Sequence, residues 1–146
     1  MPEGSHGSQS SGLRRQVRSR PRVLIAEDDD DTREIYTWCL RAAGWLVQEV
    51  ANGKEALSLA PDFAPDVIVM DVRLPVIGGL EATRRLKADP LTRHIPVVLC
   101  SGVDRRHAEP LAKQAGCEEF VAKPCTPDEL RALLEDVAFG RRSSSA

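Results

Sequence analysis

Short apolar runs alternate with amphipathic segments along most of this chain, and this alternation constrains its fold more than any other feature. Five runs have the length of strands that are buried on both faces: 23–26, 45–50, 67–70, 97–100 and 119–122. The segments between and after them repeat apolar residues at helical spacing. We therefore predict an α/β fold, a five-stranded parallel sheet with five helices on both faces, because each right-handed crossover lays its helix over the sheet.

Three of the expected helices have a clear apolar stripe. The stripes are Ile35, Trp38, Cys39 and Ala42; Ala108, Leu111, Ala112 and Ala115; and Leu130, Leu133, Leu134 and Val137. Fainter stripes over 54–60 and 80–88 predict the other two helices. Trp38 and Trp45, on either side of Gly44, are expected to pack at the corner between the first helix and the second strand.

Local signals place several helix ends. Gly44 is suited to close the first helix in a left-handed conformation, and Asp30 or Asp31 is expected to cap its start and complement its dipole. The last helix has the strongest signal, because Thr126 and Glu129 form a capping-box pattern with a proline at the first helical position.

The two ends of the chain differ in composition from the alternating region. Residues 1–22 are rich in Ser, Gly and Arg and predict a disordered basic arm; residues 140–146 predict a disordered tail, so the folded domain is expected over 23–139. Arginines without interleaved aromatics favour a solubilising extension over a nucleic-acid or membrane contact. No signal-peptide core or membrane-spanning run is recognisable in the sequence, so a cytoplasmic location is expected.

The four cysteines lack the spacing of a zinc site or a disulfide framework. Cys39 and Cys100 lie on core-facing patterns and are expected to act as small apolar residues. Cys125 precedes the last helix and follows Lys123 closely, a position that favours a lowered thiol pKa.

Polar residues follow four of the five predicted strands. Glu27 and Asp28 end the first strand, Asp71 the third, Ser101 the fourth and Lys123 the fifth. Because the carboxyl ends of parallel strands meet at one edge of the sheet, these residues are expected to lie together. The neighbouring carboxylates repel one another unless a cation is present, and Mg²⁺ accepts a few carboxylate oxygens together with water.

Phosphoryl transfer is the chemistry that this set of groups suits. Asp71 is the candidate nucleophile, which would form an aspartyl phosphate. A cation held by Glu27 and Asp28 would offset the repulsion between an anionic nucleophile and an anionic donor. Lys123 would bind one phosphoryl oxygen and Ser101 another.

Four segments carry a resemblance to a known family. They are VLIAEDD (23–29), DVIVMDVRLPVIGGLE (66–81), IPVVLCSG (95–102) and GCEEFVAKP (116–124). In order and spacing they resemble the receiver domain of bacterial two-component response regulators, over about residues 22–139. Because few residues follow this region, the chain is expected to be a stand-alone single-domain response regulator rather than an excised receiver.

The resemblance implies a role for each candidate residue. Asp71 is implied as the phosphoacceptor, Glu27 and Asp28 as the Mg²⁺-binding acidic pair, Arg73 as a further metal ligand through its backbone carbonyl, Ser101 as the switch hydroxyl, Phe120 as the switch aromatic and Lys123 as the phosphate-binding lysine. It also implies the strand order 2-1-3-4-5 of the flavodoxin-like receiver fold and a cis Lys123–Pro124 bond. Gly78-Gly79 stands where the family usually has Asp-Gly, which predicts a more flexible loop.

The expected function is therefore phosphorylation-dependent signalling. A sensor histidine kinase or a histidine phosphotransfer protein would donate a phosphoryl group to Asp71 with Mg²⁺. A downstream protein would then bind the surface formed by the fourth helix, the fifth strand and the fifth helix. The chain would catalyse only its own phosphorylation and dephosphorylation, so it is not expected to be an enzyme with a separate substrate, and no direct nucleic-acid or membrane binding is expected.

Two alternatives come from other classes of protein. A flavodoxin-like FMN carrier would share the fold, but the acids after the first strand would repel a phosphate. A degenerate receiver would act as an unphosphorylated protein-binding module; retention of all five site residues disfavours it.

Overall fold

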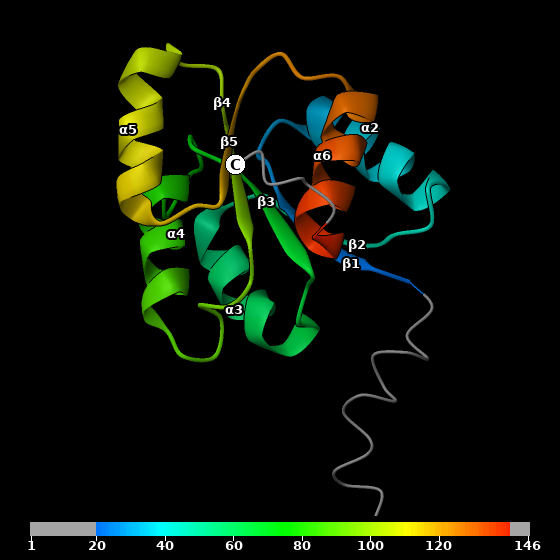
Figure 1. The fold of residues 1–146 in the computed structure, drawn as a ribbon, viewed down its shortest axis with the longest axis horizontal. Helices are drawn as coiled ribbons and strands as arrows, with labels where there is room; N and C mark the ends of the chain where they lie inside the picture. The colour runs from blue at the N-terminus through cyan, green and yellow to red at the C-terminus, as the bar shows by residue number, and fades with distance from the viewer. Residues whose placement is uncertain (1–19, 141–146) are drawn as a thin grey trace, which may run out of the picture.

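The computed structural model describes residues 20–140 of the chain, and almost all of the predicted arm and tail lies outside this range. In chain order the elements are β1 (Arg22–Ala26), α2 (Asp30–Ala42), β2 (Leu46–Val50), α3 (Gly53–Phe63), β3 (Val67–Asp71), α4 (Gly79–Ala88), β4 (Val97–Ser101), α5 (Arg105–Ala115), β5 (Glu119–Ala122) and α6 (Pro127–Phe139). The strands form one parallel sheet in the order β2-β1-β3-β4-β5, which confirms the predicted α/β fold and strand order (Figure 1).

Helices cover both faces of the sheet. Helices α2 and α6 pack on one face, and α3, α4 and α5 pack on the other (Figure 1). Strand β1 serves both layers, because Val23 and Ile25 belong to the α2/α6 core while Leu24 and Ala26 belong to the other. A strand that buries alternate residues on opposite faces must be apolar on both, which is why the inner strands β1, β3 and β4 each contain an unbroken apolar run. The edge strand β2 was expected to be buried on both faces as well, but its Gln48 and Glu49 are exposed.

The strand register brings the polar strand ends to one edge of the sheet. Ala26 is the partner of Met70, and Ser101 is the partner of Ala122. The residues that follow these positions therefore emerge side by side, and the Lys123 amide donates to the Ser101 carbonyl oxygen at 2.8 Å. The site described below is built on this edge.

The buried face of α2 differs from the predicted stripe. Tyr36, Thr37 and Leu40 are buried, whereas Ile35 and Trp38 are 54% and 74% exposed. The prediction was wrong because a count of apolar residues overlooked Tyr36, which buries its ring and directs its hydroxyl to a carbonyl oxygen on another element. Trp38 is consequently not a packing residue.

Other predictions for the helices have mixed outcomes. Trp45 is buried, as expected, and Gly44 has φ +100°, in the left-handed region. Asp29 rather than Asp30 or Asp31 caps α2, because its Oδ2 accepts hydrogen bonds from both the amide and the hydroxyl of Thr32. The α6 capping box is confirmed, while Leu111 of the α5 stripe is 42% exposed.

The loop between β3 and α4 makes a close backbone approach at Gly79, while the greater flexibility expected from Gly78, whose Cβ would make only ordinary contacts, stays a prediction. A Cβ on Gly79 would lie 2.0 Å from the Asp71 carbonyl oxygen, and one on Gly53 would lie 2.0 Å from the Ile77 carbonyl oxygen. Both glycines are therefore required by close backbone approaches. Within this loop Val76 has φ +70°, a conformation that β-branched residues rarely adopt.

Candidate functional site

A cleft of about 450 Å³ lies at the carboxyl edge of the sheet. It is lined by Glu27, Asp28, Asp29, Asp71, Arg73, Gly102, Val103 and Lys123. These residues directly follow or end β1, β3, β4 and β5. The structure thus brings together the acidic, basic and loop residues that the sequence placed at separate strand ends.

Lys123 links the two buried carboxylates of this cleft. Its Nζ donates to Glu27 Oε1 at 2.9 Å and to Asp71 Oδ2 at 3.1 Å. Glu27 and Asp71 are 4% and 7% exposed, so water does not replace these contacts easily. Buried charges persist when they are paired and hydrogen-bonded, and the ammonium meets that requirement for both acids.

Backbone amides complete the environment of the two acids. Glu27 Oε2 accepts from the Asp29 amide at 3.1 Å, and Asp71 Oδ1 accepts from the Arg73 amide at 3.1 Å. Arg33, which the sequence analysis missed, donates to the Glu27 carbonyl oxygen at 2.7 Å and so ties α2 to the end of β1. Its position six residues after Glu27 gives no local signal of this contact.

Burial and pairing shift the titration of the two partners in this ion pair. Burial raises the pKa of Glu27, an effect that the hydrogen bond from Lys123 opposes and the charge of Asp71 reinforces. Burial alone would lower the pKa of Lys123, but the hydrogen bond to Glu27 and the charge of Asp71 outweigh it and raise that pKa. Lys123 is therefore a permanent cation at neutral pH.

Three carboxylates of the cleft fit a divalent cation. One oxygen each of Glu27, Asp28 and Asp71 lies within 4.8 Å of the others, and Asp28 is exposed while the other two are buried. An all-oxygen donor set with an open side suits a hard cation that keeps several waters, as Mg²⁺ does. The donor chemistry therefore fits the predicted ion, and Arg73 lines the same cleft.

Neither of the two predicted switch residues lines the cleft, although Ser101 directly precedes the lining residue Gly102. Ser101 is buried, and its Oγ accepts a hydrogen bond from the Val103 amide at 3.0 Å. Phe120 lies on β5, half-buried against the α3/α4/α5 core, and the guanidinium of Arg105 lies 5.5 Å from its ring centroid. The contact with Arg105 was missed, because no local pattern connects a helix start with the following strand.

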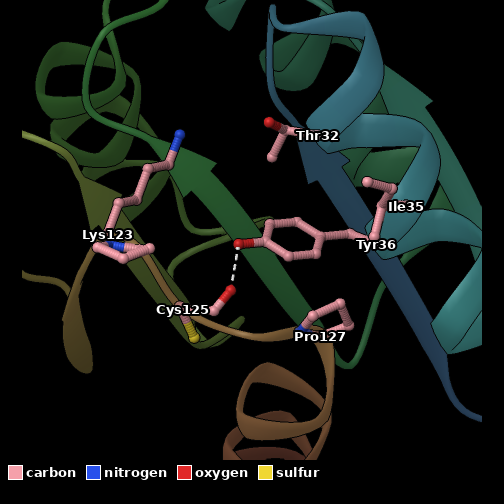
Figure 2. Close-up of a pocket in the computed structure, with 7 residues that line it drawn as sticks. Thr32, Ile35, Tyr36, Lys123, Cys125 and Pro127 are labelled. Atoms are coloured by element: carbon pink, nitrogen blue, oxygen red, sulfur yellow. Dashed lines mark hydrogen bonds between the residues drawn. The ribbon is translucent and has the colours of Figure 1, made fainter.

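A second hollow adjoins the cleft through Lys123 (Figure 2). It is lined by Thr32, Ile35, Tyr36, Lys123, Pro124, Cys125 and Pro127. The Tyr36 hydroxyl donates to the Cys125 carbonyl oxygen at 2.9 Å, as the dashed line in Figure 2 marks. Burial, with smaller contributions from neighbouring groups, raises the pKa of Tyr36 to about 12. This bond joins α2 to the segment between β5 and α6.

The thiols do not form a reactive centre. The predicted lowering of the Cys125 pKa was wrong, because burial and the charge of Glu129 raise it. Cys100 is buried as expected, and burial raises its pKa to about 12. Cys39 is only half-buried, since the face of α2 that carries it turns partly toward solvent. The Lys123–Pro124 bond is cis, as the resemblance implied.

The fold and the cleft together define a doubly wound α/β domain with an acidic, lysine-bridged site at its carboxyl edge. The response regulator receiver domain family matches residues 23–135, and the chain belongs to that family. It is a receiver domain of two-component signalling, a class that binds Mg²⁺ at its acidic site and interacts with histidine kinases or phosphotransfer proteins. No helix within residues 20–140 has the length and apolar character to cross a membrane.

Individual relatives agree with this assignment. The polar-differentiation response regulator DivK of Brucella anthropi is 38% identical over 102 residues, which cover 70% of this chain and 83% of that protein. A putative response regulator from Chloroflexus aurantiacus superposes with a TM-score of 0.78 at 32% identity, over 82% of this chain and 98% of that one.

A further solved structure bears on the metal. The receiver domain of the sensor histidine kinase PA1611 from Pseudomonas aeruginosa has a TM-score of 0.77 and 30% identity, over 82% of this chain and 98% of that one. That structure has a magnesium ion coordinated in its active-site cleft.

Proposed function

We propose that this chain accepts a phosphoryl group on Asp71 from a phosphohistidine of a sensor histidine kinase or a histidine phosphotransfer protein. The observation that carries the proposal is the lysine bridge: Lys123 Nζ lies 3.1 Å from Asp71 Oδ2 and 2.9 Å from Glu27 Oε1. One ammonium is thus positioned beside the nucleophilic oxygen, where charge develops when a phosphoryl group arrives.

The reaction breaks the P–N bond of the donor and forms a P–O bond to one Asp71 oxygen. The donor imidazole leaves with the electron pair and takes up a proton. Glu27, Asp28 and Asp71 would hold Mg²⁺, which neutralises phosphoryl charge when bound, and the Arg73 carbonyl remains a predicted further ligand. Lys123 would then bind a phosphoryl oxygen in place of Asp71 Oδ2, and the Asp71 Oδ1 contact with the Arg73 amide would keep the carboxylate oriented.

The output is a change of surface. A phosphoryl group on Asp71 carries about −1.5 to −2 charge beside Ser101 and replaces the single charge of the carboxylate. The Ser101 hydroxyl would leave the Val103 amide and donate a hydrogen bond to a phosphoryl oxygen. The Phe120 ring would then turn inward, toward the space that the hydroxyl leaves. The surface that changes its partner affinity would be the one formed by α5, β5 and α6, and the expected cytoplasmic location is part of the same proposal.

The donor is expected to approach across α2. Ile35 and Trp38 are exposed on this helix, and an apolar patch of this kind marks an interaction site. Ile35 also lines the hollow in Figure 2, which reaches the phosphorylation cleft through Lys123. A partner seated on this patch would place its histidine near Asp71.

Phosphorylation with a small donor tests the proposal without a known kinase. Acetyl phosphate and Mg²⁺ should label the wild-type protein with an acid-stable, base-labile phosphate, and Asp71→Asn should remove the label. Asp31→Asn is the matched control, since Asp31 belongs to the same acidic run but does not line the cleft. A label that persists in Asp71→Asn would contradict the acceptor assignment.

The same experiment separates this proposal from a degenerate receiver. Chelation of Mg²⁺ should abolish labelling, and Lys123→Met should reduce it strongly while the protein stays folded by circular dichroism. A wild-type protein that takes no label at any Mg²⁺ concentration would favour the unphosphorylated binding module.

A further inference from the structure

Arg105 lies at the junction of the two predicted switch residues. It is the first residue of α5 and follows Ser101 by four positions. Its guanidinium carbon is 5.5 Å from the centroid of the Phe120 ring, within the range of a cation–π contact. A second contact, from its Nη1 to Glu109 Oε1 at 3.4 Å, holds the side chain along the helix. Arg105 therefore connects the segment that follows Ser101 with the Phe120 ring on β5.

Only three residues separate Ser101 from Arg105, and two local hydrogen bonds order this segment. Ser101 Oγ accepts from the Val103 amide at 3.0 Å, and the Asp104 side chain accepts from the Arg106 amide at 3.3 Å. If Ser101 rotates toward the cleft, its Oγ leaves the Val103 amide. Val103 is two positions before the start of α5, so this step would act on the segment that leads into the helix.

The first turn of α5 has few of the features that stabilise a helix start. It carries Arg105, Arg106 and His107 at the positive end of the helix dipole, and this turn of Arg105–Ala115 contains no acidic residue. Pro110 lies inside the helix and lacks the amide that would bond the Arg106 carbonyl. The turn that holds Arg105 is therefore weakly tied to the rest of α5.

We propose that Arg105 is a positioning residue for Phe120, whose ring it holds in the resting position until Ser101 turns toward the phosphoryl group and draws the start of α5 away. This proposal rests on the phosphorylation of Asp71 proposed above. When the guanidinium leaves the ring, Phe120 is free to turn inward. Phosphorylation therefore acts on the ring in two ways: through the start of α5, which carries Arg105, and through the space that the Ser101 hydroxyl leaves. Arg105 sets how often the ring is released in the unphosphorylated protein.

Four variants test the coupling. Arg105→Met removes the charge and keeps the chain length, and Arg105→Lys restores a cation. Arg106→Met is the matched control, because Arg106 is the next residue, carries the same charge and has a 92% exposed side chain. Phe120→Leu removes the ring. Each is first checked for folding by circular dichroism.

The measurements are proton NMR of the Arg105 side chain and the rate of labelling by acetyl phosphate with Mg²⁺. At rest the Arg105 side-chain protons should be shifted upfield by the Phe120 ring, and the shift should vanish in Phe120→Leu and after phosphorylation. Arg105→Met should label about two- to fivefold faster, the factor that an exposed cation–π contact supports. Arg105→Lys should restore much of the wild-type rate, and Arg106→Met should not accelerate labelling.

Specific outcomes overturn the proposal. The first is an equal acceleration of labelling by Arg106→Met, which would indicate a net-charge effect. The second is an acceleration by Arg105→Met that persists in the Phe120→Leu background. The third is an upfield shift of the Arg105 protons that survives phosphorylation. A wild-type protein that takes no label overturns the proposed function and, with it, the release step. A labelled protein whose upfield shift persists overturns the role of Arg105 alone.

Discussion

Helices α5 and α6 each begin a few residues after a strand that carries a site residue, yet their first turns are built in opposite ways. The start of α6 has a complete capping box, in which Thr126 and Glu129 exchange hydrogen bonds of 3.0 and 3.1 Å. Pro127 occupies its first position, and its first turn is acidic. These features match the free amides and the dipole of a helix start.

The start of α5 lacks those features. Its first turn is basic, its cap is a single bond of 3.3 Å from the Arg106 amide to Asp104, and a proline interrupts its interior. The difference teaches how the two helices serve one site. Lys123 precedes α6 and is held against two buried acids, whereas Ser101 precedes α5 and, in the proposed mechanism, must move.

The largest expected effect concerns the burial of Tyr36, whose hydroxyl donates to the Cys125 carbonyl oxygen just before α6. The folded-state pKa of Tyr36 is raised above its unfolded value to about 12, so its stabilisation is complete below pH 10 and is lost as the pH rises from 10 to 12. The loss should approach about 3 kcal/mol above pH 12, and about half of it, roughly 1.4 kcal/mol, should be present at pH 11. Tyr36 is the chain's one tyrosine, so tyrosinate absorbance follows it directly. Urea unfolding at pH 9 and pH 11 measures this part of the loss, and Tyr36→Phe should lack it; a tyrosinate midpoint near pH 10 would contradict the burial of the hydroxyl.

Replacing the proline of α5 should make the stability of this helix more similar to that of α6. Pro110→Ala restores the amide that bonds the Arg106 carbonyl, and it should raise the free energy of unfolding by about 2 kcal/mol, the helix gain less the entropy that proline removes from the unfolded chain. Urea unfolding measures the change. If the start of α5 must move, the same variant should also label more slowly with acetyl phosphate; unchanged stability would show that the proline does not weaken α5.

Removing the capping box should weaken the start of α6. Thr126→Ala takes away the acceptor for the Glu129 amide and should lower the free energy of unfolding by about 1 kcal/mol. Thermal unfolding measures the change. Ser58→Ala is the control and should have little effect, because Ser58 is an exposed residue on α3. If the two substitutions had equal effects, the Thr126 cap would not stabilise the start of α6.

The smallest effect tests the charge of the first turn of α5. Arg106→Glu puts an acid at the positive end of the helix dipole and should stabilise the protein by about 0.5 kcal/mol at low salt, with less gain in 1 M NaCl. Arg106→Gln should give part of the gain. An effect that does not depend on salt would point to a cause other than the dipole.

Several features of the fold could be predicted because they depend on short stretches of sequence. The apolar runs located the five strands. For the inner strands β1, β3 and β4 the reason is that a strand buried on both faces has no polar position to spare, whereas the edge strands β2 and β5 are only partly buried. The α6 capping box and the left-handed Gly44 are local as well, because each depends on residues within one turn. The resemblance added the strand order and the cis Lys123–Pro124 bond, which no periodicity reveals.

The candidate site was predicted in part. The residue types at the strand ends placed Glu27, Asp71 and Lys123 at one edge, and the structure brings their charged atoms into contact. Arg33 and Arg105 were missed, because each acts on a residue of another element and carries no motif. The roles assigned to the site residues remain predictions for the labelling experiments.

The sequence alone determined the alternation of strands and helices, because a parallel sheet imposes burial on its strands, and it placed polar residues after four of the five strands. Only the tertiary structure decided which face of α2 is buried and how tightly the β3–α4 loop packs. Tyr36 turns inward toward a carbonyl 89 residues away, and Gly79 sits against the backbone of Asp71. Such contacts join segments that are distant in the chain, so no local pattern of residues encodes them.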